Sequence, residues 1–165
     1  MMKRKLICSS YDMERAKNML WKLDRNINII GADEVFYPYV MIWYSIHVGK
    51  GRFSKLNKFL NCIVDGVSGS VYEGKGTPAM IDVEIEEKKS LELQVTLDRC
   101  HEIGHHFAMK QFLGKAKLMI TPAIKVITEE DFYKRFYIMR CLDEEARDYF
   151  IMVDAIDGGL SVLDC

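Results

Sequence analysis

The chain has 165 residues, of which 49% are hydrophobic and 28% are charged, and its net charge is −1 at pH 7. This length allows one sizeable core or two small units that share one, and the lack of a basic excess argues against general nucleic-acid binding. The number of cysteines is odd and none are in CxxC spacing, which is typical of a reducing compartment. The N-terminal apolar run is too short for a signal peptide or a membrane span. We therefore predict a cytoplasmic protein with no nucleic-acid or membrane partner.

A short strand and a helix are expected at the start of the chain. Leu6–Cys8 is apolar and predicts a short edge strand. Apolar residues then recur at three- and four-residue intervals over Tyr11–Asp24, which is typical of a helix with one apolar face. Ser9 and Ser10 precede this segment, and hydroxyl side chains are favoured N-caps, so we expect one of them to cap the helix.

A three-stranded meander is predicted next. Val35–Val48 is rich in aromatic and β-branched residues, which favour strands. Pro38 cannot donate a ladder hydrogen bond, so we expect it at the start of this strand or at a bulge. After a glycine turn at Gly49–Gly51, Phe59–Asp65 is expected to return antiparallel, and a further tight turn leads to the third strand at Val71–Tyr72.

The second half of the chain has a similar order of elements. Met80–Glu87 alternates apolar and acidic residues, which predicts a half-buried strand. Asp98–Lys115 is expected to be the second helix. An aromatic strand at Glu130–Met139 follows, then a polar turn near Asp143–Arg147 and a returning strand at Tyr149–Asp154.

A Val-Asp turn occurs in both halves, at Val64–Val71 and at Val153–Leu160. We therefore predict an α+β fold, with two helices packed on antiparallel β-sheet and a duplicated helix-plus-three-strand unit. The predicted repeats are residues 1–75 and 76–165, sharing one core. The unit resembles modules of the PepSY type, whose last strands carry a Val-Asp-x-x-(Ser/Thr)-Gly-x-Val turn; the second copy has Asp157 at the Ser/Thr position. The resemblance implies an interaction or inhibitory domain.

The second predicted helix contains the motif His101-Glu102-Ile103-Gly104-His105. His-Glu-x-x-His on a helix places two imidazoles one turn apart, where His101 and His105 can share a tetrahedral zinc ion. Glu102 would then act as the general base for a zinc-bound water. These residues resemble the active-site helix of the zincin metallopeptidases, and the resemblance implies a zinc-dependent peptidase.

A peptidase of the gluzincin type also needs a third metal ligand, usually a glutamate on a later helix. The resemblance assigns this role to Glu145, with Glu144 as the substitute. The turn that we predict at Asp143–Arg147 conflicts with this assignment, because a hairpin removes the helix that usually holds the ligand. The sequence leaves open whether this segment is helix or hairpin.

The spacing of the second helix predicts which of its faces is buried. Gly104 is expected to allow close approach of another backbone, and His106 is expected to face away from the packed side. Both histidines of the motif should therefore point at packed protein. The residues expected to share this face are Leu97, His101, Gly104, His105, Ala108 and Phe112.

Two functions from different classes fit these observations. The leading hypothesis is a non-enzymatic intracellular binding or regulatory module that acts through its sheet face or edge. Its partner would be a protein, a peptide or a second copy of the chain, held at the aromatic face of the sheet, because large exposed apolar patches mark contacts. The alternative is the zinc metallopeptidase. A chance occurrence of His-Glu-x-x-His in the helix of a non-catalytic module is the competing explanation of that motif.

Overall fold

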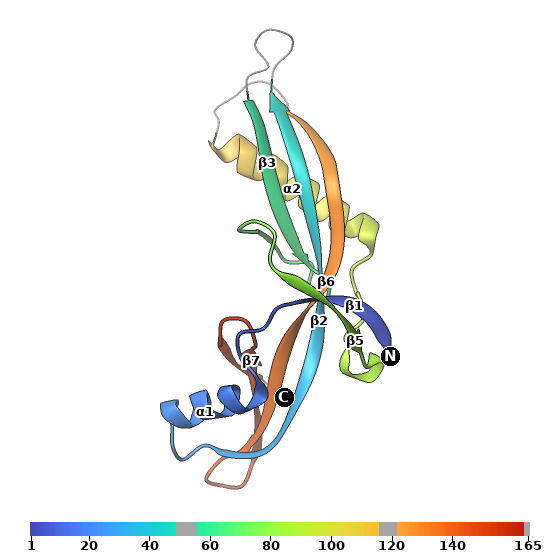
Figure 1. Cartoon of the computed structure of the whole chain (residues 1–165). Coiled ribbons are helices and arrows are strands. Elements are labelled where there is room, and N and C mark those ends of the chain that lie inside the picture. Colours follow the sequence, from blue (N-terminus) through green and yellow to red (C-terminus); the bar gives the residue numbers. More distant parts are fainter. Residues whose placement is uncertain (49–55, 116–121, 164–165) are drawn as a thin grey trace. The chain divides into compact units, whose positions relative to one another are not determined.

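The computed structural model describes residues 1–48, 56–115 and 122–163, so the turn expected at Gly49–Gly51 lies outside the described residues. Within them the fold is α+β: two α-helices, a short 3-10 helix at Glu87–Lys89 and a mostly antiparallel eight-stranded sheet (Figure 1). Neither α-helix is long and apolar enough to cross a membrane. The elements are β1 (Met2–Ile7), α1 (Met13–Leu23), β2 (Asn28–Val48), β3 (Leu56–Asp65), β4 (Val71–Glu73), β5 (Met80–Ile85), α2 (Leu97–Lys115), β6 (Ala123–Leu142), β7 (Asp148–Asp154) and β8 (Leu160–Leu163).

The chain forms two compact units, and each is built from separate parts of the sequence. Unit 1 contains Met1–Tyr37, Ala79–Leu91 and Tyr133–Cys165, whereas unit 2 contains Pro38–Pro78 and Glu92–Phe132. The long strands β2 and β6 contribute residues to both units. The units therefore have a different membership from the repeats that the sequence predicts.

In unit 1, α1 packs on strands β6 and β7. The N-cap of α1 is Asp12, whose carboxylate accepts the backbone N–H of Arg15 at 2.7 Å, so the expectation of a serine cap at Ser9 or Ser10 is wrong. Strand β1 lies between β6 and β5 and is therefore not an edge strand. The core beneath α1 consists of Ala16, Leu20, Tyr137, Met139, Cys141, Ile151, Val153 and Ala155.

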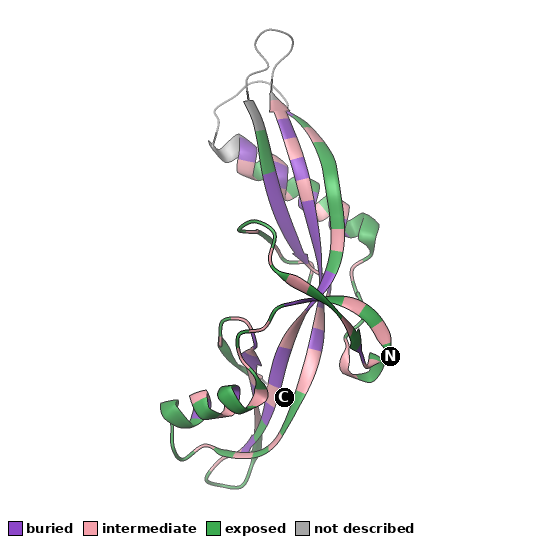
Figure 2. Ribbon diagram, in the orientation of Figure 1, coloured by how far each residue is buried: buried purple, intermediate pink, exposed green. Residues whose placement is uncertain are grey.

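In unit 2, α2 packs on one face of a sheet with the strand order β4-β3-β2-β6. Antiparallel pairing of β2 with β3 places Val40 opposite Val64 and Tyr44 opposite Leu60, so the even-numbered residues between positions 40 and 46 of β2 and between positions 60 and 64 of β3 face the helix. Figure 2 shows the buried stretches that result on these strands. The core beneath α2 consists of Val40, Ile42, Tyr44, Ile46, Leu60, Cys62, Val64, Cys100, Ala108 and Phe112.

Each helix packs on strands from the other half of the chain. Helix α1, which precedes strands β2 to β4, covers β6 and β7. Helix α2, which precedes strands β6 to β8, covers β2 and β3. An apolar periodicity identifies the buried face of a helix but not the sheet that covers it. For this reason the sequence does not reveal this exchange of helices, in which each helix packs on the strands of the other half.

The two Val-Asp turns have the same backbone hydrogen bonds. In each, the aspartate N–H donates to the carbonyl five residues later, and the aspartate carbonyl accepts the N–H of the glycine four residues later. The aspartate carboxylate also accepts the N–H two residues later at 2.8 Å in both copies. Both glycines have positive φ, which L-residues rarely adopt. The residues are Asp65, Gly69 and Ser70 in the first turn and Asp154, Gly158 and Gly159 in the second.

Strand β2 is longer than the sequence predicts. It runs without interruption from Asn28 to Val48, so Pro38 lies in its interior rather than at its start. Pro38 still contributes an acceptor, because its carbonyl receives the N–H of Gly66 at 2.9 Å. Pro38 therefore contributes no N–H donor to the hydrogen bonds of β2, but its carbonyl remains an acceptor.

Candidate functional site

Helix α2 begins where Thr96 accepts the backbone N–H of Arg99 on its hydroxyl at 3.2 Å. Its buried residues recur every four positions, at Cys100, Gly104, Ala108 and Phe112. The buried face is thus rotated from the expected one: Leu97 is 47% exposed, and His105 is exposed too. The prediction that both motif histidines point at packed protein is wrong, because the small apolar Cys100 takes the buried position next to the sheet instead. The expected exposure of His106 is confirmed.

The glycine of the motif has a packing role. A Cβ atom added to Gly104 would lie 2.5 Å from the hydroxyl oxygen of Tyr44, which is 1% exposed. The close neighbour is therefore the Tyr44 side chain, whereas the sequence predicts another backbone. The Tyr44 hydroxyl donates to the carbonyl oxygen of His101 at 3.4 Å. Burial raises the pKa of Tyr44 well above its usual value, so this hydroxyl stays a donor across the physiological range.

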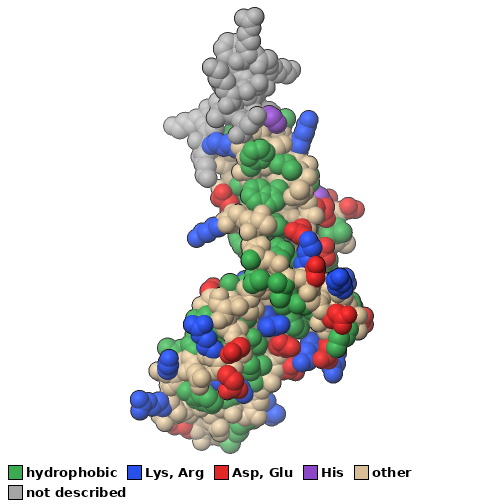
Figure 3. Space-filling view, viewed as in Figure 1, with side chains coloured by type: hydrophobic (Ala, Val, Ile, Leu, Met, Phe, Trp, Pro, Cys, Tyr) green, Lys and Arg blue, Asp and Glu red, His purple; other side chains and the backbone are tan. Residues whose placement is uncertain are grey.

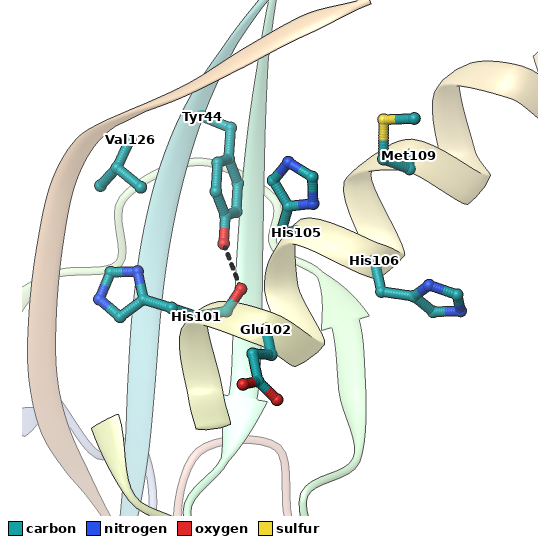
Figure 4. A pocket seen from close by; sticks show the side chains of 7 residues that line it. All are labelled: Tyr44, His101, Glu102, His105, His106, Met109 and Val126. Atoms are coloured by element: carbon teal, nitrogen blue, oxygen red, sulfur yellow. Dashed lines mark hydrogen bonds between the residues drawn. The ribbon is translucent and has the colours of Figure 1, made fainter. Parts of the chain in front are cut away.

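The polar side chains of the motif are engaged in separate contacts. His101 Nε2 contacts a carboxylate oxygen of Glu129 on β6. Glu102 forms an ion pair with Arg99 one turn earlier on the same helix, at 2.8 Å. Figure 4 shows the imidazoles of His101 and His105 on either side of the Tyr44 ring. The motif therefore joins α2 to β6 through His101 and leaves His105 toward solvent.

The two candidate third ligands lie in a hairpin of unit 1. Asp143 donates its N–H to the carbonyl of Arg147 at 3.0 Å, which closes the turn between β6 and β7. The Glu145 side chain is 71% exposed and forms an ion pair with Arg147 at 2.8 Å. The segment around Glu144 and Glu145 is thus a turn, as its polar composition predicts, and lacks the helix that a gluzincin ligand needs.

No three His, Cys, Asp or Glu side chains come together to form a metal site among the residues that the structure describes. His101 and His105 line one hollow with Glu102, and Nε2 of His101 is engaged by Glu129. The spacing of the motif remains compatible with zinc. The arrangement of the side chains fits a helix-to-strand contact better.

A groove lies between α2 and β6 and has a volume of about 540 Å³. This volume is within the range of ligand-binding clefts in proteins. Figure 4 shows its lining, which consists of an aromatic ring, a thioether, an aliphatic side chain, three imidazoles and one carboxylate. The lining residues are Tyr44, His101, Glu102, His105, His106, Met109 and Val126.

Strand β6 forms one border of this groove, and in unit 2 it is an edge strand. On the side away from β2, its described partners are β1 at Tyr133 and β7 from Phe136 onward. The stretch 123–131 therefore has no described strand on that side. Val126 is 48% exposed and Ile127 is 49% exposed, and adjacent residues of a strand face opposite sides of the sheet. The edge is apolar on both faces.

The sheet face opposite α2 carries exposed aromatic side chains. Phe59 on β3 is 67% exposed and Tyr72 on β4 is 42% exposed, whereas Tyr39 is buried and stacks on Phe132 with ring centroids 5.6 Å apart. Figure 3 shows hydrophobic side chains gathered on this face over the strands of unit 2. Among the aromatic residues that the structure describes, eight are buried and three are exposed.

A scan against protein-family models, a search of curated proteins and a search of solved structures each give no match. Function must therefore be inferred from the site itself. The sequence patterns identify the motif but miss three residues of the groove, Tyr44, Met109 and Val126, and the partner of His101, Glu129. The alternation of Val40, Ile42 and Tyr44 indicates that Tyr44 faces a core, whereas no local pattern pairs Glu129 with His101.

Proposed function

We propose that this protein is a non-enzymatic binding module that takes up an extended segment of a partner protein as an additional strand on β6. The observation that carries the proposal is the open edge at residues 123–131, with Val126 and Ile127 each about half exposed. An unpaired, apolar edge is a template for strand addition, and proteins that do not use such an edge protect it. The four cysteines within the described part of the chain have no disulfide partner, which supports a reducing, cytoplasmic setting.

Three of the other strand edges are protected by recognisable means. Strand β4 has only three residues and β8 only four. Strand β5 carries exposed acidic side chains at Asp82 and Glu84. The apolar part of the open stretch of β6, residues 123–127, has a single charged residue, Lys125, whereas the stretch ends in Glu129, Glu130 and Asp131. This contrast favours β6 over β4, β5 and β8 as the edge that a partner uses.

Strand addition supplies affinity through backbone hydrogen bonds. Each such bond contributes about 0.5–1.5 kcal/mol net of the water bonds that it replaces. An edge of this length offers about four bonds, and part of this free energy offsets the ordering of the partner segment. We therefore expect a short unoptimised peptide to bind with a Kd of roughly 1 mM or weaker.

The zinc metallopeptidase remains a second candidate, supported by the spacing of His101 and His105 and by the shared groove that they line with Glu102. It requires His101 either to leave Glu129 or to bind zinc through Nδ1, and it requires a third ligand from outside the hairpin of Glu144 and Glu145. The binding module requires neither change, and for this reason we place it first.

The test uses a soluble peptide of about nine residues that alternates valine and threonine between terminal lysines. We expect backbone amides of residues 123–131 to shift in NMR spectra and to become protected from hydrogen exchange when the peptide is added. A variant with Val126→Glu and Ile127→Glu should lose binding, although its added charge attracts the lysines.

The matched control is the variant with Leu160→Glu and Val162→Glu, which alters two exposed apolar residues on the short edge strand β8. It should bind the peptide as the wild type does. Equal loss of binding in both variants, or amide shifts on another strand edge, would contradict the proposal.

A further inference from the structure

The groove between α2 and β6 lies where it can bind one side chain of an added strand. Successive side chains of a strand point to opposite faces, so every second side chain of a partner paired with β6 would point toward α2. Val126 is the β6 residue that borders the groove, and Tyr44 and Met109 line it from β2 and α2. A partner side chain beside Val126 would enter the groove. In strand-addition complexes, such hollows supply specificity while the backbone supplies affinity.

The size and lining of the groove favour a large aromatic side chain. A hollow of about 540 Å³ leaves a small aliphatic side chain with few contacts. The exposed imidazole of His105 offers an aromatic contact, and Met109 offers a polarisable sulfur on a flexible chain, whereas Tyr44 is 1% exposed and forms the buried floor. Aromatic and sulfur–aromatic contacts of this kind add to the burial of apolar area.

Two carboxylates at the groove favour an aromatic side chain that carries a hydrogen-bond donor. Glu102 lines the groove, and Glu129 holds His101 at its border. Each carboxylate has one described partner, Arg99 or His101, and an ionised carboxylate can accept about four hydrogen bonds. An indole N–H can therefore bond to either of them, whereas a phenyl ring offers no donor.

The charges on the open edge of β6 favour a partner segment with basic residues. The stretch 123–131 has one basic residue, Lys125, and ends in three acidic residues, Glu129, Glu130 and Asp131. A partner segment with basic residues is complementary to this charge, and like charges across adjacent strands are destabilising. The same edge would disfavour an acidic segment.

We infer that the partner is an extended basic segment of another protein, with a tryptophan-type side chain that occupies the groove between α2 and β6. This inference rests on the proposed function, because the side chain reaches the groove only when the segment pairs with β6. Val126, Met109 and Tyr44 are the apolar walls of the site, and Glu102 and Glu129 are its acceptors.

The test compares peptides of about nine residues that share alternating threonine and valine between terminal lysines and differ only at the central position on the valine face. Alanine, phenylalanine and tryptophan stand there in turn, and Kd is measured by NMR titration of labelled full-length protein. We expect the tryptophan peptide to bind about tenfold more tightly than the alanine peptide, a difference of about 1.4 kcal/mol. The phenylalanine peptide should lie between them.

Two protein variants distinguish a loss of binding in the groove from an effect that any methionine substitution has on the protein. Met109→Ala removes one wall, and the preference for tryptophan over alanine should fall to about threefold or less. Met13→Ala changes a half-buried methionine of α1, in unit 1, and should leave the preference unchanged. A glutamate-ended tryptophan peptide should bind several-fold more weakly than the lysine-ended one.

The outcomes distinguish this inference from the proposed function. If all peptides bind equally and the amides of residues 123–131 shift in each case, strand addition stands and the inference about the groove is wrong. If no peptide shifts these amides, both are wrong. A preference for tryptophan that Met109→Ala and Met13→Ala reduce alike would also overturn the assignment of the groove.

Discussion

Replacing Gly104 by alanine tests whether the glycine of the His-Glu-x-x-His motif serves packing. The new Cβ would lie 2.5 Å from Tyr44 Oη, 3.3 Å from Tyr44 Cζ and 3.4 Å from Ile42 Cδ1. Carbon atoms in contact prefer about 3.5–4.0 Å, so the hydroxyl must move by about 1 Å in a buried site. Overpacking of this kind costs about 1–3 kcal/mol, and the better helix propensity of alanine offsets about 1 kcal/mol. We expect Gly104→Ala to lower the free energy of unfolding by up to about 2 kcal/mol.

The substitution Tyr44→Phe removes the atom responsible for the clash. In that background the nearest remaining contact is the ring carbon at 3.3 Å. We therefore expect Gly104→Ala to change the free energy of unfolding by less than about 0.5 kcal/mol there, because the propensity gain offsets the residual crowding. The assay is urea denaturation of the four proteins of the double-mutant cycle, followed by circular dichroism.

The control is Gly31→Ala, whose Cβ would have its nearest neighbour at 3.8 Å, an ordinary contact. Its effect should be small and the same with tyrosine or phenylalanine at position 44. If Gly104→Ala costs equally in both backgrounds, the clash with Tyr44 is not the reason for the glycine, and the packing explanation of the motif is refuted.

Three further predictions follow from the hairpin and the motif. Elemental analysis by mass spectrometry should find well below one zinc per purified, untagged chain, and His101→Ala should leave that content unchanged; one zinc per chain that this variant loses would favour the peptidase. Ala146, at the hairpin tip, has φ of +58°. Ala146→Gly should therefore raise the free energy of unfolding by about 0.5–1 kcal/mol in urea denaturation, because the left-handed region strains an L-residue, and a lower value would contradict this account. The backbone N–H of Arg147, with smaller contributions from Glu145, holds the pKa of Asp143 below 3.8. Ionised Asp143 therefore stabilises the turn above its unfolded pKa, and this stabilisation is lost as the pH falls through the lowered pKa. A carboxyl NMR titration that gives 3.8 or more would exclude these bonds in solution.

Local patterns predict much of unit 2. The density of β-branched and aromatic residues locates the pairing of β2 with β3, and Val71–Tyr72 and the second helix lie where periodicity places them. The hairpin at Asp143–Arg147 also follows from its polar composition. In each case, the property that determines the element is carried by residues near one another in the chain.

The remaining features depend on contacts between distant segments. The buried face of α2 differs from the predicted one because Cys100, rather than His101, faces the sheet, and periodicity alone leaves an error of one position. Pro38 lies within β2 because its carbonyl bonds to Gly66, which is far away in the sequence. The exchange of helices between the two halves has no local signature. The internal duplication remains a prediction, to which the matching hydrogen bonds of the two Val-Asp turns lend support.

The most direct test of the binding module is a nuclear Overhauser experiment on labelled protein with the tryptophan peptide bound. Strand addition places the Cα atoms of paired residues about 4.5–5.5 Å apart. It therefore predicts cross-strand contacts between backbone protons of the peptide and backbone protons of residues 123–131. It also predicts contacts of the indole ring with Met109 and Val126. Backbone contacts on another strand edge, or contacts confined to side chains, would contradict the account.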